Sequence, residues 1–212
     1  MGGAGGPFGM RFSTSAGRRA GSMHAGVGAS SKPRAYERDL VCSLEELYTG
    51  TTKKMKIGRT RFHNGQPVKE DSVVTVDVKA GWKEGTKITF AGEGGQEAPN
   101  GPPGDLVFVV KCRPHARFVR DGSHLIYPVP LPLLKALTGF TVPVVTLDNR
   151  TLHVKVDEIV SPKFRKIVPG EGMPISKKPG EKGDLILEFD ISFPRRLTDE
   201  QKAKLREILG NS

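Results

Sequence analysis

The sequence contains little cysteine and no long hydrophobic run, and each shortage excludes a class of protein. Its only two cysteines among 212 residues, Cys42 and Cys112, are far apart and lack the paired C-x-x-C spacing of a zinc or thiol-redox site. This predicts packed free thiols in a reducing compartment. No apolar run approaches the roughly 18 to 20 residues that a membrane-spanning helix needs. We therefore expect a soluble, cytoplasmic protein, with the nucleus as an additional location.

Residue patterns for catalysis are also missing. The histidines are scattered without the i, i+4 or short-loop spacing of metal ligands: His24, His63, His115, His124 and His153. No G-x-S-x-G elbow, phosphate-binding loop or dinucleotide fingerprint occurs. Carboxylates such as Asp184 stand in turns, where they more often cap backbone amides than act as an acid or base. The sequence therefore predicts a protein that is not an enzyme and needs no cofactor or metal.

Glycine and proline are abundant, and their placement favours β structure. The chain has 26 Gly and 16 Pro, which suit turns better than long helices. From residue 36 onward, short runs of alternating or β-branched residues stand between these turn formers, which is typical of strands with one buried face. The clearest runs are residues 73–78, 87–90, 106–110, 151–156 and 185–191. Residues 1–35 are rich in Gly, Ser and Ala with two Phe, and we expect a flexible linker there.

An internal repeat divides the remainder into two modules. The segment Leu44–Gly50 returns as Leu133–Gly139, and Gly-Glu-Gly and Gly-Asp-Leu landmarks follow in the same order in both halves. In each half, the first landmark suits one helical turn closed by a Gly that can take positive φ. The predicted fold is mainly β, with two consecutive similar sandwich-like modules over residues 36–113 and 114–195 that meet near residues 113–118.

The pattern of residues 196–212 predicts a short amphipathic helix. Thr198 and Gln201 have the spacing of a capping box, after which Leu205, Ile208 and Leu209 lie on one side of the helix. A single helix with one apolar stripe is marginal alone, so it must pack on its own module or on a partner subunit. Because it follows the last strand as an appendage, we favour homodimerisation through these three residues.

A basic stretch over residues 53–61 allows two interpretations. A formal net charge of +10 and this stretch could attract nucleic acid, but aromatic residues for base stacking are not interleaved with it. Read as a strand, the stretch puts Met55 and Ile57 on one face and Lys54 and Lys56 on the other. A basic nucleic-acid-binding β protein is therefore the alternative to a protein that binds apolar segments.

Several of these segments closely resemble the C-terminal region of DnaJ-type co-chaperones. The resemblance lies in residues 39–57, 79–88, 118–122 and 170–174. The chain lacks the zinc-binding C-x-x-C-x-G-x-G repeats of type I members, so it resembles type II. It also lacks the J domain with its His-Pro-Asp loop, and residues 1–35 resemble the Gly- and Phe-containing linker that follows that domain. The resemblance implies a fragment of a longer protein that does not stimulate ATP hydrolysis by itself.

The resemblance also implies partners and sites. The first module is expected to hold extended apolar segments of unfolded client proteins in a groove beside an exposed strand edge, with matching positions at Leu40, Met55, Ile57, Phe90 and Phe118. Lys53 and Lys54 match the positions that bind the acidic C-terminal tail of the heat-shock ATPase chaperone. Arg117 departs from the family, because it stands where an apolar residue would extend the groove. A homodimer is implied, and neither a membrane nor a nucleic acid is an expected partner.

Overall fold

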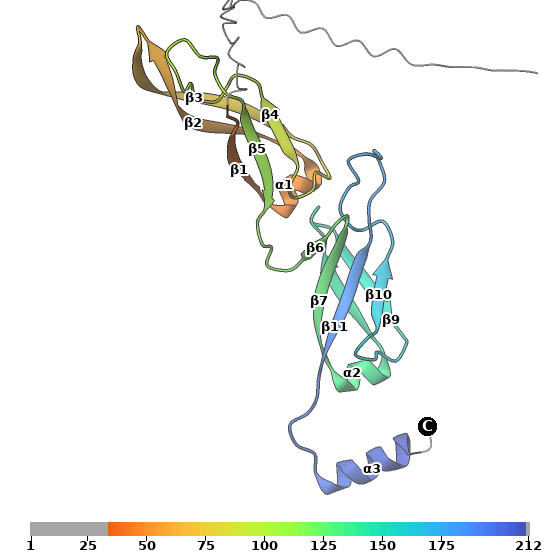
Figure 1. The fold of residues 1–212 in the computed structure, drawn as a ribbon. Coiled ribbons are helices and arrows are strands. Elements are labelled where there is room, and N and C mark those ends of the chain that lie inside the picture. The colour runs from red at the N-terminus through yellow and green to blue at the C-terminus, as the bar shows by residue number, and fades with distance from the viewer. Residues whose placement is uncertain (1–33, 211–212) are drawn as a thin grey trace, which may run out of the picture. The chain divides into compact units, whose positions relative to one another are not determined.

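The computed structural model describes residues 34–210, so nearly all of the linker expected over residues 1–35 lies outside the described range. Two sets of strands follow each other along the chain (Figure 1). The first set comprises β1 (Tyr36–Cys42), α1 (Leu44–Thr49), β2 (Thr51–His63), β3 (Gln66–Val78), β4 (Lys87–Phe90) and β5 (Leu106–Cys112). The second set comprises β6 (Val119–Asp121), β7 (His124–Pro132), α2 (Leu133–Thr138), β8 (Phe140–Val145), β9 (Thr151–Val156), β10 (Arg165–Val168) and β11 (Leu185–Ser192).

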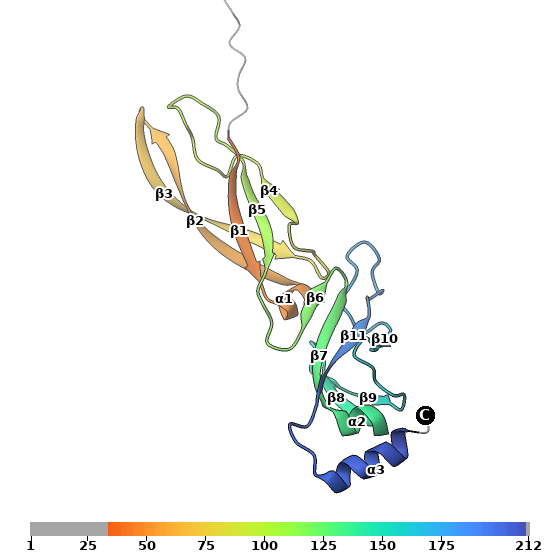
Figure 2. The ribbon, with the colours of Figure 1, turned by 60° about the horizontal axis from the view of Figure 1, so that its bottom comes forward.

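Each set contains one sheet and one hairpin. In the first set the sheet order is β1-β5-β4 and the hairpin is β2-β3; in the second the sheet order is β10-β11-β7-β6 and the hairpin is β8-β9 (Figure 2). The parallel pairs correspond in register, because Tyr36 lies opposite Leu106 in β1-β5 and Leu125 lies opposite Leu185 in β7-β11. The prediction of a mainly β fold with two similar modules is confirmed. The exact module boundaries remain a prediction.

The long hairpin β2-β3 gives the first module its most extended element. Asn64 and Gly65 connect the two 13-residue strands with φ values of 51° and 77°, as a two-residue type I′ turn requires. Along β3 the residues Val74, Val76 and Val78 are buried while their neighbours are exposed. This alternation confirms the strand predicted over residues 73–78 and turns one face of the hairpin toward the core.

The short helices confirm the repeat in detail. α1 begins at a capping box in which Ser43 Oγ accepts from Glu46 N and Glu46 Oε2 accepts from Ser43 N. α1 ends at Gly50 and α2 ends at Gly139, and each glycine has a φ of 80°. Since L side chains rarely adopt this backbone conformation, glycine is required at both positions.

The loop after β3 contacts the second module. Gly81 N donates to the Leu47 carbonyl at 2.7 Å, and a Cβ built on Gly81 would lie 2.3 Å from the Pro174 carbonyl oxygen. Arg120 Nη1 donates to the Trp82 carbonyl at 2.8 Å. Two of the segments that carry the family resemblance, residues 79–88 and 170–174, therefore meet at this contact.

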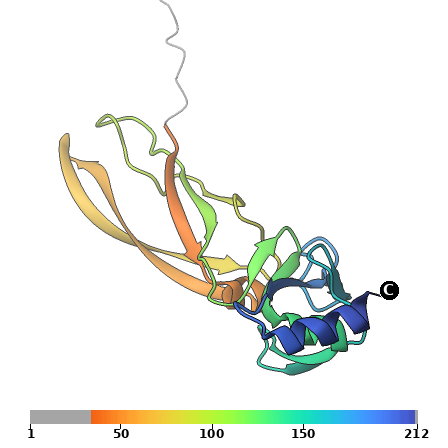
Figure 3. The same cartoon turned by 90° about the horizontal axis from the view of Figure 1, so that it is seen from below.

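The C-terminal helix α3 (Asp199–Leu209) begins at the predicted capping box. Gln201 N donates to Thr198 Oγ1 at 3.3 Å, and Thr198 N donates to Gln201 Oε1 at 2.9 Å. No residue of α3 is buried, so its apolar side chains remain exposed; Figure 3 shows the helix in dark blue beside the end marked C. Among the described residues, no helix is long and apolar enough to cross a membrane.

Candidate functional site

The outer edge of β1 carries backbone groups that no other strand pairs with in residues 34–210. Tyr36 N donates to the Asp105 carbonyl at 2.8 Å, so the even-numbered residues of β1 turn their backbone groups toward β5. In a parallel pair the intervening residues point the other way. The N–H groups of Glu37, Asp39 and Val41 therefore face outward.

β2 has a similar outer edge. The Thr60 carbonyl accepts from Gln96 N at 2.9 Å, on the side away from β3. Because backbone direction alternates along a strand, the other even-numbered residues of β2 also face away from β3. The N–H groups of Lys54, Lys56 and Gly58 are thus available for an added strand.

A groove lies between these two edges and has an apolar floor. Its main cavity, of about 620 Å³, is lined by Glu37, Arg38, Asp39, Met55, Lys56, Ile57, Gly58 and Phe108. A neighbouring cavity of about 370 Å³ shares Arg38, Ile57 and Gly58 with it. Met55 is half-buried, whereas Ile57 and Phe108 are buried. We call this space the β1-β2 groove.

The predicted groove residues fall into different places. Met55 and Ile57 line the β1-β2 groove together, and Leu40 is fully buried in the core beside it. Phe90 packs edge-on against Phe108, with ring centroids 5.8 Å apart, but lines neither cavity. Phe118 lines a separate pocket near the start of the second module.

The two lysines expected to bind an acidic tail project from opposite faces of β2. Lys53 lies on the Met55 face, where its Nζ is 2.8 Å from Glu46 Oε2 and donates to the Val41 carbonyl at 2.7 Å. Partial burial raises the pKa of the Glu46 carboxyl, but the hydrogen bonds from Lys53 and from the Ser43 backbone lower it by more. The pKa of Glu46 therefore lies below its usual value. Lys54 is exposed on the other face. The structure therefore does not bring the two ammonium groups together.

The rest of the basic stretch is paired with carboxylates. Arg59 Nε donates to Glu70 Oε1 at 2.7 Å, and the Arg59 guanidinium also pairs with Glu93. The hydrogen bond from Arg59 lowers the pKa of the Glu70 carboxyl. Lys56 Nζ lies 2.8 Å from a carboxylate oxygen of β3. These ion pairs hold β2 against β3 and the loop that follows β4.

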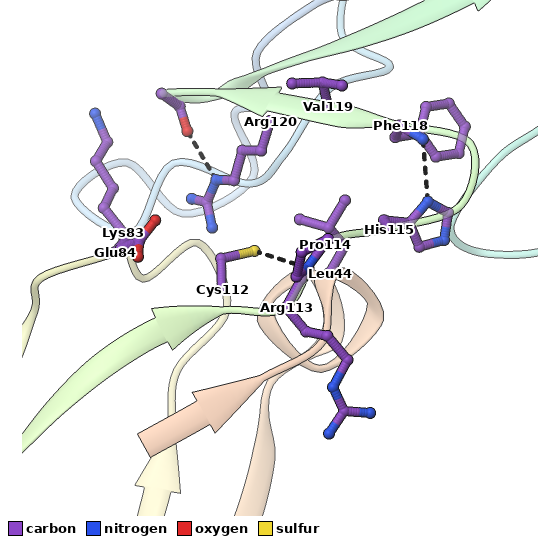
Figure 4. Close-up of a pocket in the computed structure, with 11 residues that line it drawn as sticks. Leu44, Lys83, Glu84, Cys112, Arg113, Pro114, His115, Phe118, Val119 and Arg120 are labelled. Carbon is purple, nitrogen blue, oxygen red and sulfur yellow. Dashed lines mark hydrogen bonds between the residues drawn. The ribbon is translucent and has the colours of Figure 1, made fainter. Parts of the chain in front are cut away.

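A second pocket, of about 480 Å³, lies where the first module ends (Figure 4). His115 stacks on Phe118, with centroids 5.4 Å apart, and its Nδ1 accepts hydrogen bonds from the backbone of Arg117 and Phe118. Cys112 also lines the pocket, and burial raises the pKa of its thiol, which disfavours the thiolate a nucleophile needs. Across residues 34–210, no group of three or more His, Cys, Asp or Glu side chains is arranged to hold a metal ion.

The sequence did not identify Phe108 or Arg38 as groove residues. Phe108 belongs to β5 (Leu106–Cys112), for which the run over residues 106–110 predicted a strand with one buried face. That signal predicts a core strand but does not say that the ring reaches the floor of a groove. Arg38 gave no signal, because its place in the groove depends on β1 pairing with a strand about seventy residues away.

Comparison with known proteins identifies the family. Residues 36–194 match the family model described as DnaJ C terminal domain. The chain is 47% identical over 186 residues to human DnaJ homolog subfamily B member 13, 44% identical over 173 residues to human DnaJ homolog subfamily B member 5, and 37% identical over 184 residues to protein SIS1 of Saccharomyces cerevisiae.

These alignments cover 87%, 81% and 84% of this chain and 58%, 49% and 51% of the relatives. The chain thus spans about half the length of the curated relatives it matches. The family consists of non-enzymatic co-chaperones, so the prediction that the chain is not an enzyme is confirmed. The match over most of the chain and the subfamily B relatives together show that the chain belongs to the DnaJ family, as a C-terminal domain of its class B.

Proposed function

We propose that this chain is the client-binding region of a co-chaperone, which holds extended apolar segments of unfolded proteins and works with a heat-shock ATPase chaperone of the Hsp70 type. The observation that carries this proposal is the β1-β2 groove, in which two unpaired strand edges lie on either side of an apolar floor. An extended peptide added at such an edge gains main-chain hydrogen bonds whatever its sequence, while the floor selects apolar side chains at alternate positions.

The size of the groove implies weak, reversible binding. Met55 and Ile57 offer contacts for one or two apolar anchors. Burial of each Leu- or Phe-sized anchor contributes about 1.5 to 3 kcal/mol. Association costs at least about 4 kcal/mol, so two anchors barely exceed that cost. Met55 is unbranched and polarizable, which lets it adapt to different client side chains.

The acidic tail of the ATPase chaperone is proposed to bind beside the same edge. Lys54 is exposed, and no carboxylate lies within ion-pair distance of it in the described structure. Lys53 is only 21% exposed and already contacts Glu46, so a tail carboxylate must share Lys53 with Glu46. Lys54 is therefore the more available of the two predicted tail-binding residues.

The alternative of nucleic-acid binding is less well supported. Binding to a phosphate backbone requires cations that are free to replace counterions. Most basic side chains of β2 instead contact carboxylates: Lys53, Lys56, Arg59 and Arg61. The stretch that suggested nucleic acid in the sequence is thus largely neutralised within the fold.

Dimerisation through α3 is part of the proposal. Leu205 lines an apolar pocket of about 370 Å³ with Leu133, Leu134, Leu137 and Phe193. Ile208 and Leu209 lie one turn after Leu205 on α3 and are exposed. A second copy that covers it would place two grooves on one client and raise the effective concentration of the second groove. A cytoplasmic location stays a prediction.

Fluorescence anisotropy with a labelled peptide ending in Glu-Glu-Val-Asp tests the proposal. The wild-type chain should bind it saturably, Lys54→Ala should weaken binding several-fold, and the double variant Lys53→Ala/Lys54→Ala should abolish it. The same peptide with Gln-Gln-Val-Asn and an amidated C-terminus in place of Glu-Glu-Val-Asp serves as the uncharged control. If a folded wild-type chain bound neither this peptide nor an apolar peptide, the proposed function would be wrong.

A further inference from the structure

We propose that only the first module accepts an added strand, because prolines remove outward N–H groups from the corresponding strand edges of the second module. This inference rests on the proposed function and specifies it further, since it limits each chain to one strand-binding groove. It follows from the backbone directions and the internal repeat.

The repeat gives each edge position of the first module a counterpart in the second. The segments Leu44–Gly50 and Leu133–Gly139 correspond, and both precede a hairpin. Tyr36 N donates to the carbonyl of the aspartate before β5, at 2.8 Å. Leu125 N donates to the carbonyl of the aspartate before β11, at 3.0 Å. Tyr36 and Leu125 are therefore equivalent, and the positions that follow them correspond one by one.

The outer edge of β7 has no free N–H group between Ile126 and the end of the strand. Since Leu125 points toward β11, the even-numbered residues of β7 face outward. Ile126 is covered by its pairing with β6. Pro128 and Pro130 come next on this edge and have no N–H, whereas their counterparts in β1, Asp39 and Val41, each have one.

The outer edge of β8 loses one of its outward N–H groups to a proline. Thr146 N donates at 2.9 Å to the carbonyl of the residue that precedes β9, so Thr146 faces β9, whereas Pro143 and Val145 face outward. Pro143 is the counterpart of Lys54, and because proline has no N–H group, β8 lacks an outward donor at this position. The outward carbonyl of Val145 accepts from Arg117 Nη1 at 2.8 Å and is thus already engaged.

A peptide strand needs alternating donors and acceptors along the edge it joins. Along β1 and β2 it meets both, but along β7 the prolines leave only carbonyl groups beyond Ile126, and along β8 the N–H group between those of Thr141 and Val145 is missing. Proline on an edge strand is a known way to prevent the addition of further strands. The prolines do not disturb the second module itself, because they stand at positions whose N–H groups would point away from the paired neighbour.

Titration calorimetry tests this inference with a short peptide of alternating Leu and Thr. The variants Asp39→Pro and Lys54→Pro introduce, at exposed positions of the first module, the prolines that the second module has at the equivalent positions. Asp39→Ala and Lys54→Ala change the same side chains but keep the N–H groups. Circular dichroism of every variant confirms folding.

The wild-type chain should bind one peptide per chain. Each proline variant should bind at least about fivefold more weakly than the alanine variant at the same position, as expected for one lost main-chain hydrogen bond. The double variant Asp39→Pro/Lys54→Pro should have no remaining site. Two peptides per wild-type chain, or one site surviving in the double variant, would overturn the inference while leaving the proposed function intact. Absence of wild-type binding would instead overturn the proposed function and this inference with it.

Discussion

Replacement of Met55 by aspartate should abolish client holding without unfolding the chain. Met55 lies with Ile57 on the floor of the β1-β2 groove, and it is only half-buried. In the free protein, a carboxylate there can remain in contact with water. When an apolar client side chain covers the floor, that carboxylate must lose its water without gaining a hydrogen-bond donor from the client.

The size of the effect follows from two contributions. Loss of the methionine contact removes about 1.5 kcal/mol or more of apolar burial from each bound segment. Desolvation of an unpaired polar group costs about 1 to 3 kcal/mol, and more for a charge. Together they amount to at least about 2.5 kcal/mol, which corresponds to a loss of affinity of roughly sixtyfold or more.

Suppression of the aggregation of a chemically unfolded client, followed by light scattering, is the assay. Met55→Leu conserves volume and should retain activity. Val73→Asp is the matched charge control, because Val73 is 63% exposed on the other face of the same hairpin, opposite Lys56 in register. If folded Met55→Asp protected the client as well as Val73→Asp did, the groove would not be the client site.

Three further predictions concern the modules and the helix. Gly81→Ala should destabilise the chain by about 2 to 4 kcal/mol in urea unfolding, because its φ of 80° disfavours a side chain and the new Cβ would overlap the Pro174 carbonyl. Leu205→Asp/Ile208→Asp should convert a dimer to a monomer in analytical ultracentrifugation while leaving the thermal unfolding of the β modules unchanged, since both side chains are exposed within one chain. Burial raises the pKa of Asp148, but hydrogen bonds from neighbouring threonine and arginine side chains outweigh burial and lower the pKa from 3.8 to about 2. The ionised carboxylate therefore stabilises the fold above pH 4, and its contribution of about 1 to 2 kcal/mol is lost as the pH falls from about 4 to 2. Asp148→Asn should lack this part of the acid sensitivity when unfolding is measured by circular dichroism.

The sequence predicted the elements of the fold well, because their signals are local. Alternation along residues 73–78 reports a half-buried strand whatever its neighbours are. The capping box at Thr198 and the positive φ at Gly50 are likewise set within a few residues. The Asn64-Gly65 turn of the long hairpin carried an equally local signal that the prediction did not use.

The assembly of the groove was harder to predict, because it depends on which strands become neighbours. Phe90 and Phe118 were assigned to the groove by resemblance, but β4 lies across the sheet from β1 and Phe118 packs with His115 and Tyr127. The residues that line the groove opposite β2 come from β1 and β5, and no periodicity in β2 reveals this pairing. The assignment of both phenylalanines as client contacts stays untested.

The prolines of the second module combine a local sequence signal with a backbone direction that depends on strand pairing. A strand's outward N–H groups contribute nothing to the ladder that holds its own module, so their replacement by proline changes what an edge can bind with little cost to folding. The same does not hold for inward positions such as Leu125 or Tyr36, whose N–H groups donate within the fold. Two modules of one architecture can therefore keep the same register and core while they differ in binding. In this chain the difference is carried by Pro128, Pro130 and Pro143, which the sequence displays openly but whose direction only the strand pairing defines.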